Sequence, residues 1–153
     1  MHFLELKIPP VAILLICITG MASAQLYLPQ IGLAHWLAIS IGSLFLLSGL
    51  LCIMLAVWQF RRHQTTVNPM QPESASQLLT TGMLSISRNP MYLGFVLLII
   101  ASGMALQSML FPLVCSAFIV YMTHFQIIPE ERALNALFPK DFNLYCQKTK
   151  RWI

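Results

Sequence analysis

The amino-acid sequence predicts an all-α membrane protein: a bundle of four transmembrane helices followed by an amphipathic helical tail. The first observation is composition, because 58% of the 153 residues are hydrophobic and only 9% are charged, whereas soluble domains carry about 25% charged residues. The second is distribution, because residues 8–60 and 89–129 contain no Asp, Glu, Lys or Arg. One transmembrane helix needs about 20 apolar residues, so each block accommodates two. These observations exclude a soluble or disordered chain and predict a single membrane domain over residues 1–153.

The first uncharged block divides into two predicted spans, residues 8–25 and 35–60. Two prolines open the first span, and a helix tolerates proline in its first turn. Residues 1–24 also fit a cleaved signal peptide, because a small-residue motif precedes Gln25. We expect the segment to be retained as a span, since its positive region is a single lysine offset by a glutamate.

The second uncharged block predicts spans at residues 90–106 and 109–128, joined by a tight turn at 107–108. The remaining tail, residues 129–153, is charged and carries two apolar stripes separated at Pro139. This pattern indicates two short helices. They either lie on the membrane surface as amphipathic segments or close over the loop near residue 80 as a lid.

The positive charges predict the orientation in the membrane. All nine Lys and Arg residues lie in the N-terminal segment, in loop 61–88 or in the tail, and none lies in loop 27–34 or turn 107–108. Basic loops stay on the cytosolic side, so we expect both termini and loop 61–88 to face the cytosol. The protein is then an integral component of the inner or plasma membrane, if the cell is bacterial. Basic residues beside membrane segments favour contact with anionic lipids over nucleic-acid binding.

Cysteine and glycine spacing argues against several kinds of site. The four cysteines form no C-x-x-C pair, and three of them lie in apolar runs, so we expect no metal centre and no disulfide framework. The seven glycines never approach the spacing of a dinucleotide or phosphate-binding loop. Any nucleotide-like cofactor must therefore be held in another way. The sequence does not indicate the oligomeric state.

One group of candidate functional residues lies where the chain re-enters the membrane. Pro90 is a favourable first residue for a helix, and the free amides at such a helix start can receive a carboxylate or another anion. Arg88 lies just outside this helix and offers a guanidinium to a carboxylate or phosphate. The alternative is that Arg88 only anchors the helix to lipid headgroups.

The second group is the acidic pair Glu130-Glu131, at the cytosolic end of the fourth predicted span. Consecutive helical residues point about 100° apart, so the two carboxylates cannot face the same substrate bond. We expect one to hydrogen-bond a ribose diol or an ammonium group and the other to pair with Arg88 or Arg132. The alternative is a solvated helix end.

Three motifs together resemble a known family. The string L-L-T-T-G-x5-R-N-P-M-Y-L-G begins at Leu78, E-E-x-x-L-x-x-x-F begins at Glu130, and Y-x5-R-W-I begins at Tyr145. Their order and separation resemble the isoprenylcysteine carboxyl methyltransferase family, which is grouped with the phospholipid methyltransferases. The resemblance covers residues 76–153. It implies an integral-membrane methyltransferase that uses S-adenosylmethionine and a lipophilic acceptor.

The resemblance also implies roles for individual residues. Together with the two residue groups above, it leads us to expect Arg88, Glu130 and Glu131 as the catalytic residues. Cofactor contacts carry over to Ser76, Gln77, Leu78, Leu79, Asn89, Pro90, Met91, Tyr92 and Glu130. Three departures concern the site. Leu84 stands where the family has an aromatic residue, and Asn89 stands where it often has a histidine, although asparagine is common in bacterial-type members. Gln126 stands where the isoprenylcysteine enzymes have an arginine for the substrate carboxylate.

The leading hypothesis is therefore a methyltransferase for a small lipophilic or lipid-linked acceptor, dependent on S-adenosylmethionine. Methyl transfer from a sulfonium requires mainly positioning and exclusion of water, which such sparse polar residues can provide. A non-catalytic four-span protein such as a small transporter is an alternative, but transporters of that kind place an ionisable residue inside a span. A sterol-reductase-like enzyme with a nicotinamide cofactor is the third hypothesis, and the short chain disfavours it.

Overall fold

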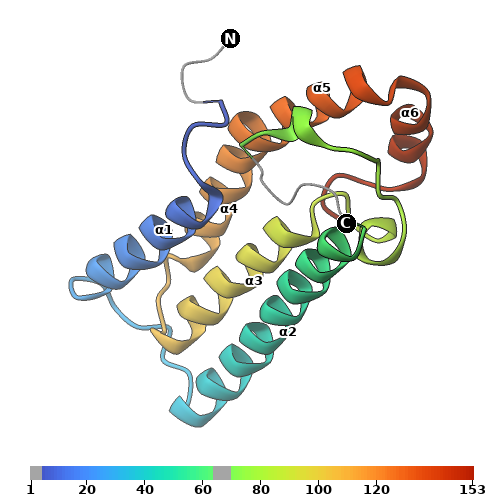
Figure 1. The fold of residues 1–153 in the computed structure, drawn as a ribbon. Helices are drawn as coiled ribbons and strands as arrows, with labels where there is room; N and C mark the ends of the chain where they lie inside the picture. Colours follow the sequence, from blue (N-terminus) through green and yellow to red (C-terminus); the bar gives the residue numbers. More distant parts are fainter. Residues whose placement is uncertain (1–4, 64–69) are drawn as a thin grey trace.

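The computed structural model describes residues 5–63 and 70–153, and within these ranges it is helical and contains no β-strand (Figure 1). The predicted loop 61–88 includes residues 64–69, which lie outside the described residues, as do residues 1–4 of the N-terminal segment. The helices are α1 (Pro10–Gln25), α2 (His35–Arg62), α3 (Pro90–Ala105), α4 (Phe111–Met122), α5 (Ile128–Leu137) and α6 (Pro139–Lys148), with 3₁₀ turns η1 (Pro72–Ser74) and η2 (Gly82–Ser85) and a π-helical turn η3 (Thr123–Ile127).

Within the part of the chain that the structure describes, two helices are long and apolar enough to cross a membrane. They are α2, with 28 residues, and the continuous helix Phe111–Leu137, with 27 residues. Helices α1 and α3 are apolar but have 16 residues each, which corresponds to about 24 Å against a hydrocarbon core of about 30 Å. The predicted all-helical class is confirmed, and the prediction that all four helices cross the membrane stays a prediction.

The sequence analysis expected the fourth span to end at residue 128, but the helix does not end there. The helix continues through Pro129 into α5. A proline inside a helix cannot donate to the carbonyl four residues earlier, which here belongs to Phe125. That carbonyl accepts a hydrogen bond from the Leu6 amide instead, at 3.0 Å. The N-terminal segment thus satisfies the acceptor that Pro129 leaves free, while the predicted break at Pro139 is confirmed between α5 and α6.

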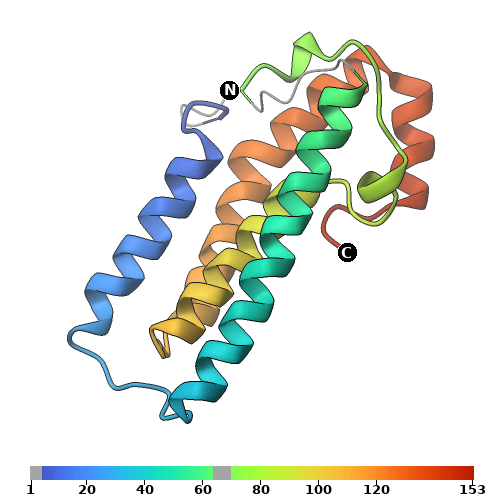
Figure 2. The same ribbon diagram turned by 60° about the horizontal axis from the view of Figure 1, so that its bottom comes forward.

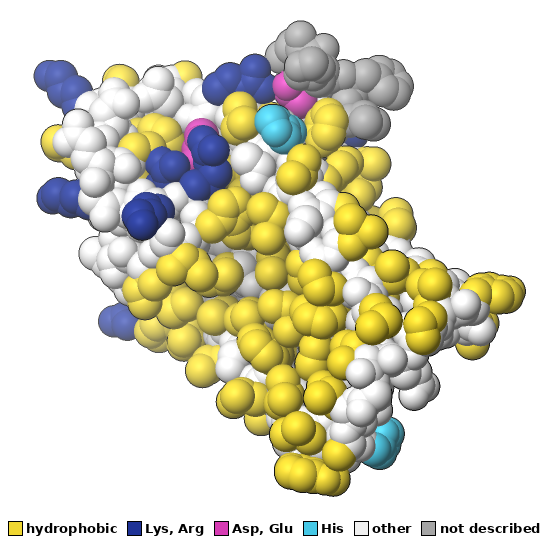
Figure 3. All heavy atoms as spheres, turned by 180° about the vertical axis from the view of Figure 1, so that it is seen from behind, with side chains coloured by type: hydrophobic (Ala, Val, Ile, Leu, Met, Phe, Trp, Pro, Cys, Tyr) yellow, Lys and Arg dark blue, Asp and Glu magenta, His cyan; other side chains and the backbone are white. Residues whose placement is uncertain are grey.

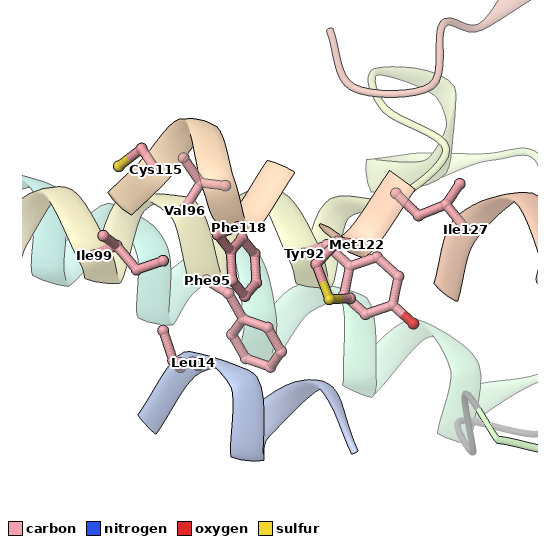
Figure 4. Packing of buried hydrophobic residues seen from close by; sticks show 9 residues of the cluster. All are labelled: Leu14, Tyr92, Phe95, Val96, Ile99, Cys115, Phe118, Met122 and Ile127. Carbon is pink, nitrogen blue, oxygen red and sulfur yellow. The ribbon is translucent and has the colours of Figure 1, made fainter. Parts of the chain in front are cut away.

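Helix α3 lies at the centre of the bundle and packs most extensively against α2. The contact depends on glycine, because a Cβ at Gly94 would lie 2.6 Å from Ile53 Cγ1 and 2.9 Å from the Gly49 carbonyl oxygen. Small residues at such an interface allow two helix backbones to approach closely. On its other side α3 packs on α1 and α4. The resulting core comprises Leu14, Tyr92, Phe95, Val96, Ile99, Cys115, Phe118, Met122 and Ile127 (Figure 4).

Different segments form the two ends of the bundle (Figure 2). Loop 26–34 and turn 106–110 meet at one end, where the Ile31 amide donates to the Gln107 carbonyl at 2.9 Å. The start of α1, the end of α2, the start of α3 and helices α5 and α6 lie toward the other end. Lys and Arg side chains gather near that end, and hydrophobic side chains cover much of the remaining surface in Figure 3.

The outer faces of the long helices are apolar. On α2, Leu44, Leu47, Met54 and Trp58 are each more than half exposed. Soluble monomers rarely expose continuous apolar areas of this kind, whereas lipid tails accommodate them. The surface therefore agrees with a membrane location.

Candidate active site

A cavity lies at the charged end of the bundle, between the end of α2, the start of α3 and helices α5 and α6. It contains every candidate site residue from the sequence analysis except Ser76. Ser76 lines a neighbouring open groove beside α6, and the two hollows share Gln77, Leu78 and Tyr145 in their walls. The cavity is lined by Phe60, Pro72, Ala75, Gln77, Leu78, Leu79, Leu84, Arg88, Asn89, Pro90, Met91, Tyr92, Glu130, Glu131, Leu134, Phe142 and Tyr145.

The loop before α3 is held in place by a polar residue of α2. Gln59 is 7% exposed, and its Nε2 donates to the Thr81 carbonyl at 2.6 Å while its Oε1 accepts from the Met83 amide at 3.2 Å. Gly82 lies between these contacts with a φ of +57°, and a Cβ there would lie 2.7 Å from Gln59 Oε1. Glycine adopts this conformation without strain, so the loop can fold tightly against α2 and bring Leu84 into the cavity wall.

Helix α6 covers this loop with an apolar face. Leu79 and Leu84 of the loop pack with Phe142 and Tyr145 of α6. The Tyr145 hydroxyl donates to the Leu84 carbonyl at 2.6 Å, and burial raises the pKa of Tyr145 well above its ordinary value, so the phenol remains a donor at neutral pH. Of the two arrangements expected for the tail, the structure contains the one in which it closes over the loop.

Glu131 is held between two arginines. Its Oε1 lies 3.0 Å from Arg88 Nη2, and Arg151 makes a bidentate contact, with Nε 3.0 Å from Oε1 and Nη2 2.6 Å from Oε2. Planar guanidinium groups suit such two-point binding of a carboxylate. The sequence analysis expected Arg88 or Arg132 as the partner of one acid; Arg88 is found there, whereas Arg132 pairs with Glu5 at 2.6 Å.

Segment 150–152 lies across the start of α3. The Arg88 amide donates to the Lys150 carbonyl at 3.1 Å, and Asn89 Nδ2 donates to the Arg151 carbonyl at 2.9 Å. Trp152 Nε1 donates to Thr123 Oγ1 at 3.2 Å. Three consecutive residues near the C-terminus therefore tie α3 to the helix that carries the acidic pair.

Glu130 has different partners from its neighbour. The Tyr92 hydroxyl and Gln126 Nε2 both donate to Glu130 Oε1, the second at 2.7 Å. Tyr92 lies at one end of the buried core, and its hydroxyl oxygen points away from Phe95 and Phe118 (Figure 4). Among the residues that the structure describes, no donor contacts Oε2, so this oxygen is available to a ligand in the cavity.

Arg88 also has one N–H donor that makes no hydrogen bond to the described residues. Its side chain is 12% exposed, and its Nη groups contact Glu131 and the Cys146 sulfur. Its Nε is buried and has no hydrogen-bond partner within residues 5–63 and 70–153. Because a buried donor without a partner is unfavourable, this atom is suited to an acceptor supplied by a ligand.

Several residues of the site were missed in the sequence analysis. Arg151 belongs to the motif Y-x5-R-W-I but received no role. Gln59 is the polar exception near the end of an apolar helix, a signal that could have drawn attention to it. The aromatic residues Phe60, Phe142 and Tyr145 also line the cavity.

Comparison with known proteins gives one family. Residues 37–141 match the family described as phospholipid methyltransferase, a region that extends from α2 into α6 and includes the start of α3 and the acidic pair. No curated protein and no solved structure matches the chain. The match covers well over half of the 153 residues, and it agrees with the resemblance that the motifs carry. The chain therefore belongs to the phospholipid methyltransferase family, a family of membrane methyltransferases.

Proposed function

We propose that the protein is an integral-membrane methyltransferase that uses S-adenosylmethionine and methylates a small lipophilic or lipid-linked acceptor. The observation that carries this proposal is the cavity at the charged end of an apolar bundle, which combines Arg88, Glu130 and the start of α3. Family membership supports the methyltransferase chemistry.

The residues around the cavity fit the charges of this cofactor. Its amino-acid part carries a carboxylate, which suits the unpartnered Arg88 Nε and the amides of Met91 and Tyr92, which lie in the first turn of α3 where a helix offers no acceptor. Its ammonium group suits Glu130 Oε2. Its adenosine part suits the apolar and aromatic wall, together with the loop residues Ser76-Gln77-Leu78-Leu79.

The bound cofactor would supply an electrophilic methyl group, and the protein would supply position and a dry environment. A thiolate or carboxylate acceptor needs no base. An amine acceptor must also lose a proton to a base. The apolar cover of Phe142 and Tyr145 would exclude water from the reacting groups.

We further propose that both termini and loop 61–88 face the cytosol and that four helices cross the membrane. The supporting observation is the concentration of charge at the cavity end. A cofactor from the cytosol would then reach the cavity directly, and a lipophilic acceptor would approach from the bilayer.

Titration of the detergent-purified protein with S-adenosylmethionine tests the cofactor assignment. The wild type should bind S-adenosylmethionine or its demethylated product with measurable heat. Glu130→Ala or Tyr92→Ala should weaken binding by about 1–3 kcal/mol, because each removes a buried polar partner. A protein that binds neither compound but binds a reduced nicotinamide would belong to the reductase alternative.

The acceptor class is tested by product extraction. Gln126 is 2% exposed and bonded to Glu130, and an amide does not supply the bidentate positive charge that arginine offers a carboxylate. With labelled cofactor, phospholipid amines or small hydrophobic thiols should therefore give more organic-soluble label than N-acetyl-farnesylcysteine. Rapid methylation of the farnesylcysteine analogue, unchanged by Gln126→Ala, would contradict this acceptor preference.

A further inference from the structure

The adjacent acids of the site differ in how their charge is compensated. Glu131 is bound by two guanidinium groups, which neutralise the charge of its carboxylate. Glu130 is bound by a phenol and a carboxamide, which are neutral donors. These donors stabilise a carboxylate without cancelling its charge, so Glu130 is the acid that can present negative charge to a ligand.

Both neutral donors act on the same oxygen of Glu130. The last torsion of a glutamate side chain is only weakly restricted by its own structure. Two hydrogen bonds to Oε1, one from α3 and one from the preceding helical turn, restrict this torsion from two directions. They leave Oε2 as the oxygen that a ligand can reach.

Gln126 is placed for this contact by the local helix geometry. It lies in the π-helical turn η3, a feature that occurs often at functional sites. It precedes Glu130 by four residues, so the two side chains lie on the same helix face. Gln126 is not among the cavity-lining residues, so it acts on the site through the residues that it contacts, and Glu130 is one of them.

We propose that Gln126 is a positioning residue: its amide, together with Tyr92, holds the Glu130 carboxylate with Oε2 toward the cavity for a positively charged ligand group. This inference rests on the proposed function for the identity of the ligand. The position that resembles a substrate-binding arginine thus has a different task here, which is to orient an acid without neutralising it.

A double-mutant cycle with S-adenosylmethionine binding as the readout separates positioning from general structural support. Gln126→Leu should weaken binding roughly tenfold, the loss expected for a hydrogen bond to a charged group. In a Glu130→Gln background the same change should have an effect below about twofold, because its partner is already altered. Gln107→Leu is the matched control: Gln107 is a glutamine of similar burial, 8% exposed, in the turn at the opposite end, and its replacement should leave binding unchanged.

Infrared spectroscopy gives a second readout that needs no cofactor. The carboxyl band that disappears in Glu130→Gln should shift in Gln126→Leu and stay in place in Gln107→Leu. An unshifted band would overturn the proposal, and so would equal weakening of binding by Gln126→Leu in both backgrounds. If the wild type binds no S-adenosylmethionine, the proposed function fails, while the infrared shift still decides whether Gln126 positions Glu130.

Discussion

At the scale of single residues, the acidic pair shows how neighbours in sequence acquire different chemistry. Glu130 points to Tyr92 and Gln126, and Glu131 points to Arg88 and Arg151. The angular separation of consecutive helical residues predicts this divergence. The partners themselves depend on which helices lie on either side.

Arg151→Ala tests the importance of the tail for the site. The change removes two hydrogen bonds to Glu131 and loosens segment 150–152 from α3. We expect cofactor binding to weaken by about 1–2 kcal/mol, a value kept modest because the arginine side chain is 36% exposed and partly screened by solvent. Calorimetric titration measures the change.

Arg151→Lys is the informative companion variant. Lysine retains the charge but cannot make the bidentate contact. The affinity of this variant for the cofactor should therefore lie between the affinities of the wild type and Arg151→Ala. Lys140→Ala, at an exposed residue of α6 that lines neither hollow, is the control and should bind as the wild type does. Unchanged binding in Arg151→Ala would show that the segment does not support the ligand site.

At the scale of elements, α2 and α3 form the framework that positions the cavity. Their backbones approach closely at Gly49 and Gly94, and α2 carries Gln59 to the loop before α3. The continuous helix Phe111–Leu137 brings the acidic pair to the same place. Within this helix, the Leu6 amide satisfies the carbonyl that Pro129 leaves free. Local sequence at Pro129 predicts a helix end, and the distant contact explains why the helix continues.

Gly94→Ala should destabilise the bundle. The added Cβ would meet Ile53 at 2.6 Å and a backbone oxygen of Gly49 at 2.9 Å; the side chain can move, whereas the backbone oxygen can move only if the helices separate. We expect a loss of about 1–3 kcal/mol, as for other overpacked cores. Thermal unfolding in detergent measures the effect.

Gly20→Ala provides the matched control for this prediction. Gly20 lies inside α1, and a Cβ there would have no neighbour within 4 Å. Alanine favours a helix over glycine by about 1 kcal/mol, so this variant should be neutral or slightly more stable than the wild type. A Gly94→Ala protein as stable as Gly20→Ala would show that the helices do not depend on the close approach.

At the scale of the whole molecule, the charged end and the uncharged end predict the orientation. Cysteine labelling in a cysteine-free background tests it, with Met70→Cys at the charged end and Tyr27→Cys at the other. The impermeant external reagent should label Tyr27→Cys in intact cells and label Met70→Cys only after the membrane is opened. The reverse pattern would contradict the proposed topology.

Much of the architecture follows from the sequence alone. The signals that define the helices are local in sequence: apolar runs, prolines at helix starts and the break at Pro139. Composition and spacing therefore predict the helices, with small errors at their ends. The cavity residues Arg88–Tyr92 and Glu130-Glu131 were also predicted, because they lie in motifs that the family resemblance covers. Ser76 was predicted from the same resemblance, and the structure places it in the adjoining groove.

Tertiary structure decided what depends on residues far apart in the chain. The sequence does not show that Arg151 reaches Glu131, that Gln59 fixes the loop at Gly82, or that Leu6 allows a helix to pass through Pro129. Nor does it show which of two adjacent acids is paired with guanidinium groups and which accepts from neutral donors. Hydrogen bonds and ion pairs form between groups a few ångströms apart, and only the packing of α2, α3, α5 and α6 brings these groups within that distance.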